Sequence, residues 1–358
     1  MLDVALRNVT VADRLRDVSA EFTRNSHTAV VGPPAAGAST LLHVIAGDLR
    51  PDRGSVIIGT RDVTSLKRAR RPLLYATSIL DAPLRWSVRH LLIAAVRRRT
   101  LDRQDRQREF ELTAAKWRLS SILDRPLREL SSSEQALANL AWIELLRPAI
   151  VVADRLLESL NASLFAEIAD DFYRTLRVIG ATVITTPSST LELGFADQIL
   201  VLENGRILQE GTPGEVYRHP ISEAAAVATG EVNIIPIHVR GNAVESAIGS
   251  WVVARPPFQG SGIALARPHD FEIAPAGAES DLIFGVEEAS FRGDRWQARG
   301  VLSGNITLRV ELPAGAAIHK GRLIPLRFDP NRFTILARDA PRITTVPTDV
   351  VPPLSESR

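Results

Sequence analysis

The alternation of apolar and polar residues predicts strands at the start of the chain. Apolar residues occupy nearly every second position in 4–9 and again in 18–22, which is the pattern of half-buried strands. Three further runs, 28–31, 149–154 and 181–186, are mostly apolar or β-branched and short. Such runs predict strands that are buried on both faces, as in the centre of a parallel sheet.

Helical periodicity fills most of the sequence between these buried runs. Apolar residues recur three and four positions apart in 88–98, 106–117, 134–146 and 161–178, which predicts amphipathic helices. Strands that alternate with helices predict an α/β fold with a mainly parallel sheet. In such a sheet, ligands bind beyond the carboxyl ends of the strands.

After residue 235 the pattern changes to short strand-like runs separated by glycine and proline turns. Examples of these runs are 251–254, 262–266, 306–310 and 322–326. They predict a small all-β barrel over 236–340. The last segment, 341–358, is rich in proline, and we expect a flexible tail there.

Composition narrows the class of protein. The chain has 358 residues, of which 45% are hydrophobic and 23% charged, as in a soluble globular protein of two or three domains. It has no cysteine, which excludes disulfides and thiolate metal sites. No apolar run reaches the roughly 20 residues of a membrane span, and the N-terminus has no secretory pattern.

The basic residues are almost all arginines. The three lysines are Lys67, Lys116 and Lys320. We interpret the basic clusters 67–71 and 97–99 as solvated surface, because the net charge is only +2. Residues 236–340 show no basic stripe interleaved with aromatic residues of the kind that nucleic-acid binding needs. No nucleic-acid partner is expected.

A glycine-rich loop joins the predicted strand 28–31 to a helical pattern. Gly32 and Gly37 have the spacing of Gly-x-x-x-x-Gly-Lys-Ser/Thr, and Ser39, followed by Thr40, occupies the hydroxyl position. Position 38, where that motif has lysine, is Ala38. The segment therefore predicts a phosphate-binding loop that lacks its cation.

The loop backbone is also altered. Backbone N–H groups between Gly32 and Ala38 could receive an anion at the start of the helix. Pro34, however, has no N–H to offer. We therefore expect ATP binding, and magnesium binding with it, to be weak or absent.

The turns and segments around this loop resemble the ATP-binding subunits of ABC transporters, of the importer type. The resemblance rests on 46–54, 59–64, 195–207 and 211–217. It implies a P-loop NTPase-like ABC domain over 1–235, with a helical subdomain at about 75–146 that contacts membrane-spanning partners. A shorter match at 262–273 resembles the OB-like accessory domain of importer ATPases, in agreement with the predicted barrel.

The resemblance also implies which residues should perform ATP hydrolysis. In the family, the loop hydroxyl and a strand-end aspartate hold magnesium, and these correspond to Ser39 and Asp154. A glutamate follows that aspartate, a glutamine follows an earlier strand, and a histidine follows a later strand. The residues at those three positions here are Arg155, Ser78 and Pro187. Together with Ala38, they are lost catalytic positions.

The segment Leu130–Glu134 aligns with the motif that the family presents to a partner's nucleotide. Ser131 could offer its hydroxyl to the γ-phosphate across a dimer interface, but both glycines of the motif are Ser132 and Ser133 here. A structural interpretation is favoured, because Ser131-x-x-Glu134 also has the form of a helix capping box.

These observations lead to one main hypothesis and two alternatives. The main hypothesis is a catalytically inactive subunit of an ABC importer, at the cytoplasmic face of the inner membrane. It would pair with a second, competent ATPase subunit and dock on transmembrane permease subunits, and a substrate-binding protein would act with it indirectly. The alternatives are an active ATPase that uses Lys67 or Lys116 and Glu158, and a regulator or scaffold that acts through its C-terminal barrel.

Overall fold

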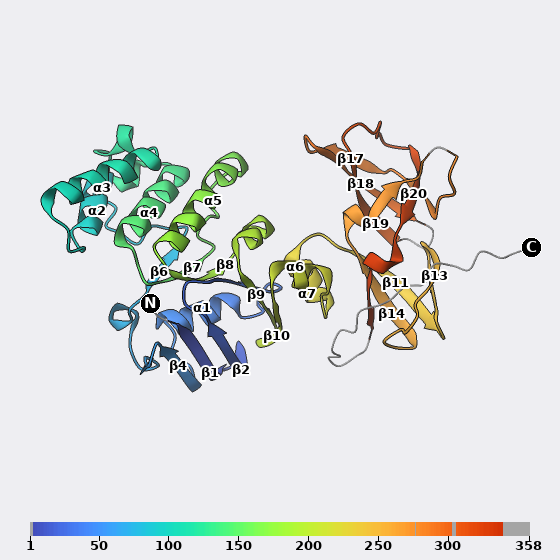
Figure 1. Cartoon of the computed structure of the whole chain (residues 1–358), viewed down its shortest axis with the longest axis horizontal. Coiled ribbons are helices and arrows are strands. Elements are labelled where there is room, and N and C mark those ends of the chain that lie inside the picture. Colours follow the sequence, from blue (N-terminus) through green and yellow to red (C-terminus); the bar gives the residue numbers. More distant parts are fainter. Residues whose placement is uncertain (1–2, 276, 303–305, 339–358) are drawn as a thin grey trace, which may run out of the picture. The chain divides into compact units, whose positions relative to one another are not determined.

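A computed structural model describes residues 3–275, 277–302 and 306–338 (Figure 1). The chain forms two compact units that divide after Pro213. The helices α6 (Pro213–Arg218) and α7 (Glu223–Thr229) therefore belong mainly to the second unit. The domain limits 1–235 and 236–340 stay predictions, and the expected tail at 341–358 lies outside the described residues.

The first unit is built on a six-stranded sheet with the strand order β10-β9-β3-β8-β7-β6. Every neighbouring pair is parallel except β9 with β10. The strands are β3 (His27–Val31), β6 (Leu74–Thr77), β7 (Ile150–Asp154), β8 (Thr182–Thr186), β9 (Gln198–Glu203) and β10 (Arg206–Gly211). This arrangement confirms the three predicted buried strands and the parallel α/β sheet.

A second, antiparallel sheet of the same unit has the order β2-β1-β4-β5. Its strands are β1 (Val4–Val11), β2 (Leu15–Phe22), β4 (Arg53–Ile58) and β5 (Arg61–Asp62). The helix α1 (Ala38–Ala46) lies between the two sheets, where Leu41, Leu42 and Ile45 are fully buried against both (Figure 1).

Helices cover the other face of the six-stranded sheet. They are α2 (Val88–Val96), α3 (Arg103–Lys116), α4 (Ser132–Leu146) and α5 (Ala162–Val178), which confirms the four predicted helices. Along β7, Ile150 and Val152 face α1, whereas Val151 and Ala153 face the helical layer. Because both faces are covered, β7 needs an unbroken apolar sequence. None of the helices in the described parts of the chain has the length and hydropathy of a membrane span.

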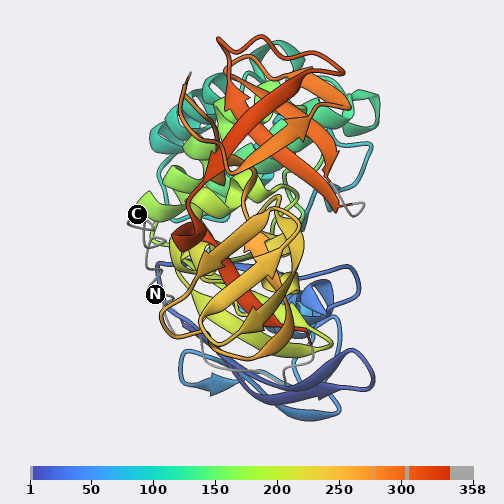
Figure 2. The ribbon, with the colours of Figure 1, turned by 90° about the vertical axis from the view of Figure 1, so that its right-hand side faces the viewer.

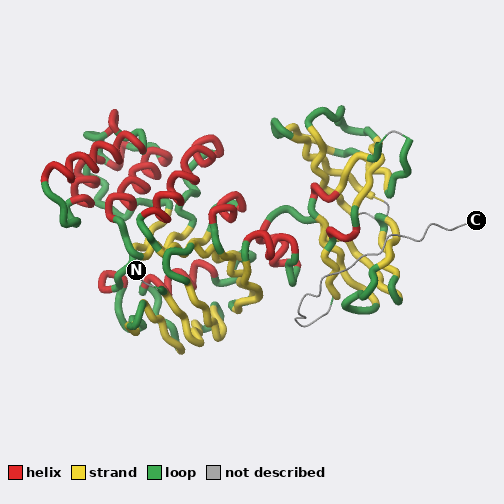
Figure 3. Tube along the Cα trace, viewed as in Figure 1, coloured by secondary structure: helices red, strands yellow, loops and turns green. Residues whose placement is uncertain are grey.

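The second unit consists mainly of antiparallel strands, which confirms the predicted all-β region (Figures 2 and 3). Its sheets have the orders β13-β12-β11-β14-β21, β15-β20-β16 and β17-β18-β19. The strands are β11 (Asn233–Arg240), β12 (Ala243–Ser246), β13 (Gly249–Val252), β14 (Gly260–Ala266), β15 (Phe271–Ile273), β16 (Leu282–Gly285), β17 (Glu288–Phe291), β18 (Arg295–Leu302), β19 (Ile306–Pro313), β20 (Leu323–Phe328) and β21 (Thr334–Ala337). One core, which includes Trp251, Phe271 and Phe284, joins the sheets.

Candidate functional site

The carboxyl ends of three neighbouring strands meet at one edge of the six-stranded sheet. Thr77 of β6 pairs in register with Asp154 of β7, and Asp154 pairs with Thr186 of β8. The residues that directly follow these strand ends are Ser78, Arg155 and Pro187. The register therefore brings the predicted aspartate and three of the predicted lost positions to a single edge.

The loop after β3 keeps the shape that its glycines require. A Cβ atom on Gly32 would lie 2.2 Å from the carbonyl oxygen of Leu202, so only glycine fits there. Gly37, which precedes α1, has φ 108°, in the left-handed region that favours glycine. Ala35 also lies in that region, with φ 65°, and has a Cβ atom to accommodate. The glycines that set the loop geometry are present even though the lysine is not.

Neither lysine of the alternative hypothesis forms a side-chain hydrogen bond or ion pair with the glycine loop in the part of the chain that the structure describes. The Nζ atom of Lys116, at the end of α3, donates to the Oε2 atom of Glu144 at 2.9 Å and to the Oγ1 atom of Thr175 at 2.7 Å. Lys67 lies exposed beside the short 3-10 helix Arg68–Arg70. Of the two lysines in the alternative hypothesis, Lys116 is therefore engaged within the helical layer, and Lys67 is distant in sequence from the loop.

Asp154 is held by side chains around it. Its Oδ1 atom accepts hydrogen bonds from the hydroxyl of Ser39, at 3.2 Å, and from the hydroxyl of Thr186. Asp154 also acts on Tyr75 of β6: burial, followed by the charge of Asp154, raises the pKa of the phenol above its ordinary range. The sequence did not indicate Tyr75 or Thr186, because their role depends on the pairing of β6 and β8 with β7.

Ser39 and Asp154 have the chemistry that magnesium requires. Magnesium in phosphate sites takes oxygen ligands from one or two protein side chains, from phosphates and from water. A hydroxyl and a carboxylate within 3.2 Å of each other provide such a pair. The residues present therefore fit the ion, although they also bind each other.

Arg155 occupies the position where the resemblance implies a proton acceptor. Its backbone has φ 48°, and its N–H donates to the carbonyl oxygen of Thr186 at 3.0 Å. The guanidinium contacts the carboxylate of Glu158 at 2.6 Å. Arginine stays protonated and cannot act as a base. The spare carboxylate of the alternative hypothesis, Glu158, is paired with this cation.

The remaining two predicted lost positions offer little in place of the side chains that the resemblance implies. Pro187 is half-buried and has no polar side-chain atom. The hydroxyl and the backbone N–H of the next residue, Ser188, both donate to the carboxylate of Glu192, so both donors are already engaged. Ser78 is half-buried after β6, and its short side chain has neither the length nor the amide of glutamine.

Ser131 forms the predicted capping box at the start of α4. Its hydroxyl accepts from the N–H of Glu134 at 3.3 Å, and its own N–H donates to the Glu134 carboxylate at 2.7 Å. Arg125 contacts the other oxygen of that carboxylate at 2.8 Å. The hydrogen bond from the Ser131 backbone is the main reason why the pKa of Glu134 lies below its ordinary value. The structural interpretation is confirmed, and a role of Ser131 toward a partner stays a prediction.

Comparisons with known proteins agree with this fold. The sequence model of the ABC transporter family matches residues 15–157. An Fe(3+) ions import ATP-binding protein of Pseudomonas fluorescens is 30% identical over 323 residues, which are 87% of this chain and 86% of that protein. A sulfate/thiosulfate import ATP-binding protein of Burkholderia mallei is 28% identical over 350 residues, or 94% of this chain and 93% of that protein.

Solved structures share the fold of the first unit at lower identity. The ADP conformation of an ATP-binding cassette of an ABC transporter has a TM-score of 0.53 and 21% identity, and covers 64% of this chain and 100% of its own. An ATP-binding subunit of another ABC transporter has a TM-score of 0.54 and 19% identity, and the match covers 60% of this chain and 92% of that subunit. This chain therefore belongs to the ABC transporter family, among the ATP-binding subunits of importers.

Proposed function

We propose that this chain is a catalytically degenerate ATP-binding subunit of an ABC importer. One observation supports the proposal: the edge at which the glycine loop meets Asp154 has Ala38, Arg155 and Pro187 where the family resemblance implies a lysine, a glutamate and a histidine. The fold around that edge is intact. The chain would thus keep its place in a transporter without hydrolysing ATP on its own.

The rate losses expected from these substitutions support the proposal that the chain does not hydrolyse ATP at a useful rate. Loss of a general base typically slows a reaction about a hundredfold to ten-thousandfold. Loss of one preorganised charge or donor at the developing negative charge typically costs a further factor of about 10² to 10³. Such effects are not additive, but each lost group belongs to a different part of the mechanism.

Nucleotide binding in this chain's own site would be weak or absent. The loop backbone can approach an anion, but Ala38 offers no side-chain cation and Pro34 has no backbone N–H. Ser39 and Asp154 would hold magnesium, which supplies charge neutralisation to bound phosphates. Without the lysine, the chain's own residues contribute only hydroxyl and backbone dipoles to the β- and γ-phosphates.

The driving reaction would take place in a partner. We infer that a second, competent ATPase subunit pairs with this chain, and that Ser131 contributes to the partner's nucleotide site. Transmembrane permease subunits would receive both chains at the cytoplasmic face of the membrane, and a substrate-binding protein would act indirectly. The names of the relatives cover glycerol 3-phosphate, Fe(3+), sulfate and molybdate, so they support importer function without selecting a solute.

The test is ATP hydrolysis by the purified chain, alone and after co-purification with its transporter partners. The chain alone should release no more phosphate than a buffer control, whereas the assembled complex should be active. An Asp154→Asn variant of this chain should leave the activity of the complex nearly unchanged. Magnesium-dependent hydrolysis by the chain alone that Asp154→Asn abolishes would overturn the proposal in favour of an active ATPase.

A further inference from the structure

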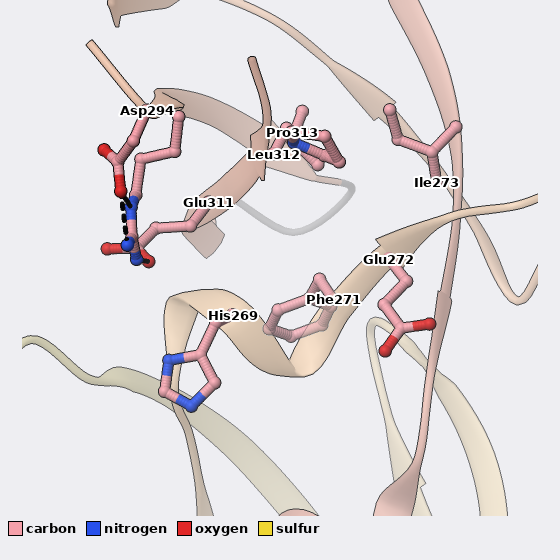
Figure 4. Close-up of a pocket in the computed structure, with 9 residues that line it drawn as sticks. His269, Phe271, Glu272, Ile273, Asp294, Glu311, Leu312 and Pro313 are labelled. Atoms are coloured by element: carbon pink, nitrogen blue, oxygen red, sulfur yellow. Dashed lines mark hydrogen bonds and ion pairs between the residues drawn. The ribbon is translucent and has the colours of Figure 1, made fainter. Parts of the chain in front are cut away.

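The second unit contains a pocket of about 450 Å³ (Figure 4). One wall comes from the short 3-10 helix η5 (Pro268–Asp270) and from β15, and the other comes from β18, β19 and the turn before β18. Its volume lies within the range of roughly 300–1,000 Å³ that is usual for small-molecule sites. It is separate from the strand edge that carries Asp154.

The middle of the pocket is apolar. Phe271 and Leu312 are almost fully buried, and Ile273 and Pro313 line the pocket beside them. In Figure 4, Phe271 lies across the pocket from Leu312 and Pro313. Ile273 and Pro313, which keep exposed surface, would contact the hydrocarbon part of a ligand and remove it from water.

The charged side chains of the pocket are mostly acidic. Arg295 is bracketed by two carboxylates, with 2.6 Å from Nη2 to Asp294 Oδ2 and 2.9 Å from Nη1 to Glu311 Oε2 (Figure 4). Each carboxylate meets the guanidinium through one of its two oxygens. Glu272 adds a third carboxylate to the lining and has Arg332 beside it, outside the lining, at 3.5 Å.

This distribution of charge selects the sign of a ligand. The single lining guanidinium already has two anionic partners, so an incoming anion would have to compete with both carboxylates. A cation, in contrast, would meet carboxylate oxygens and gain charge-assisted hydrogen bonds. Charge complementarity therefore favours a cationic ligand.

The wall that carries His269 is held in place before any ligand arrives. The His269 ring stacks on Tyr217 with a centroid distance of 6.1 Å. Asp270 accepts a hydrogen bond from the backbone N–H of Arg267 at 2.6 Å, and the buried Arg267 guanidinium bonds to the backbone of Tyr217 at 2.9 Å. A wall that is already ordered loses less conformational entropy on binding.

We propose that this pocket binds a small organic cation, a primary ammonium group on an apolar body. The ammonium group contacts the carboxylates of Glu311 and Asp294, and the apolar body lies against Ile273 and Pro313. The proposal does not depend on nucleotide binding or on the catalytic state of the first unit.

A matched set of four-carbon probes tests the sign of the charge. The full-length chain is titrated with butylammonium, butan-1-ol and butanoate, and binding is followed by ligand-observed NMR. Butylammonium should bind most tightly, butanol more weakly and butanoate least. The proposal is wrong if butanoate binds as tightly as butylammonium, or if the ammonium shows no saturable binding.

Two variants then separate charge from structure. Glu311→Gln should weaken butylammonium binding about tenfold or more, because it removes a charged acceptor. Arg295→Gln should tighten it, because the competing cation is removed, whereas a purely structural role would weaken binding in both variants. Glu288→Gln, whose carboxylate pairs with Arg299 at 3.0 Å and does not line the pocket, should change nothing. If circular dichroism shows that Arg295→Gln is unfolded, the titration of the wild-type chain with the three probes still tests the proposal.

Discussion

The guanidinium of Arg155 contacts the carboxylate of Glu158 at 2.6 Å, directly beyond the strand end that carries Asp154. Both side chains are about half exposed, so the pair adds little to stability. The pair matters more for the chemistry of the site than for the stability of the fold. The carboxylate of Glu158, which the alternative hypothesis needs as a base, is paired with the guanidinium of Arg155.

Restoration of the loop cation should restore nucleotide affinity. In Ala38→Lys, the ammonium can contact the β- and γ-phosphates, and a charge-assisted contact of this kind should tighten ATP binding by about tenfold or more. The measurement is a titration with a fluorescent ATP analogue in the presence of magnesium. Ala38→Met, which adds length without charge, is the control, and equal affinities of the two variants would contradict the prediction.

Restoration of the base alone should not restore hydrolysis. Arg155→Glu supplies a carboxylate, but Ala38 and Pro187 still leave the phosphates without their cation and imidazole. We expect phosphate release from Arg155→Glu to equal that of the wild type, and measurable turnover to need Ala38→Lys and Pro187→His in the same chain. Steady hydrolysis by the single variant would show that the other two positions matter less than the geometry indicates.

The capping box of α4 makes a separate prediction about stability. Ser131→Ala removes the hydroxyl that accepts the N–H of Glu134, and loss of such a cap typically costs about 1 kcal/mol. Ser131→Asp keeps an acceptor and should retain most of the stability. The comparison is made by denaturant unfolding of the full chain; no difference between the alanine and aspartate variants would argue against the cap.

The sequence predicted most elements of the first unit because buried positions of a helix or strand recur as apolar residues with that element's period. The run at 150–153 is apolar throughout since both faces of β7 are covered. The hydrogen bond of Asp154 with Thr186 and its charge effect on Tyr75 have no such sequence signature, because they arise from the register of strands far apart in the chain. For the same reason, the grouping of α6 and α7 with the second unit was not predicted: Arg267 contacts both helices across 38 or more residues.

His27 should make stability depend on pH. Burial lowers its pKa from 6.5 to about 4. Its Nδ1–H donates to the Phe195 carbonyl, so Nε2 of the neutral ring accepts from the Thr185 hydroxyl at 2.9 Å. Because the folded pKa lies below the unfolded one, the unfolded state binds more protons between these values. The stabilisation that comes from neutral His27 is fully present above pH 6.5. The free energy of unfolding then falls by up to about 3 kcal/mol as the pH drops to 4.

The check is the free energy of unfolding of wild type and His27→Phe at several pH values. The phenyl ring keeps the stack on Tyr173, whose centroid lies 4.7 Å from the imidazole, but it cannot titrate. The variant should be less stable than wild type at pH 7, and its loss of stability between pH 6.5 and 4 should be smaller. Parallel pH profiles would mean that His27 does not change protonation over this range.

Arg267 should hold α6 and α7 to the second unit. Its side chain is only 7% exposed, and its guanidinium donates at 2.9–3.1 Å to the carbonyl oxygens of Tyr217, Ala226, Gly230 and Glu231 and to the hydroxyl of Thr229. Arg267→Met leaves these buried acceptors without their donor, at about 1–3 kcal/mol for each group that water cannot reach. Arg267→Lys keeps a charge but loses the planar fork and should be intermediate.

Hydrogen exchange resolves this effect better than global unfolding, because a chain with two units need not unfold in one step. Amides of 217–231 should exchange much faster in Arg267→Met than in wild type, whereas amides of β7 in the first unit should keep their rates. Arg240→Met, which changes an exposed arginine on β11 of the same unit, serves as the matched control. If 217–231 stays as protected in Arg267→Met as in this control, packing of α6 and α7 rather than the guanidinium holds the segment.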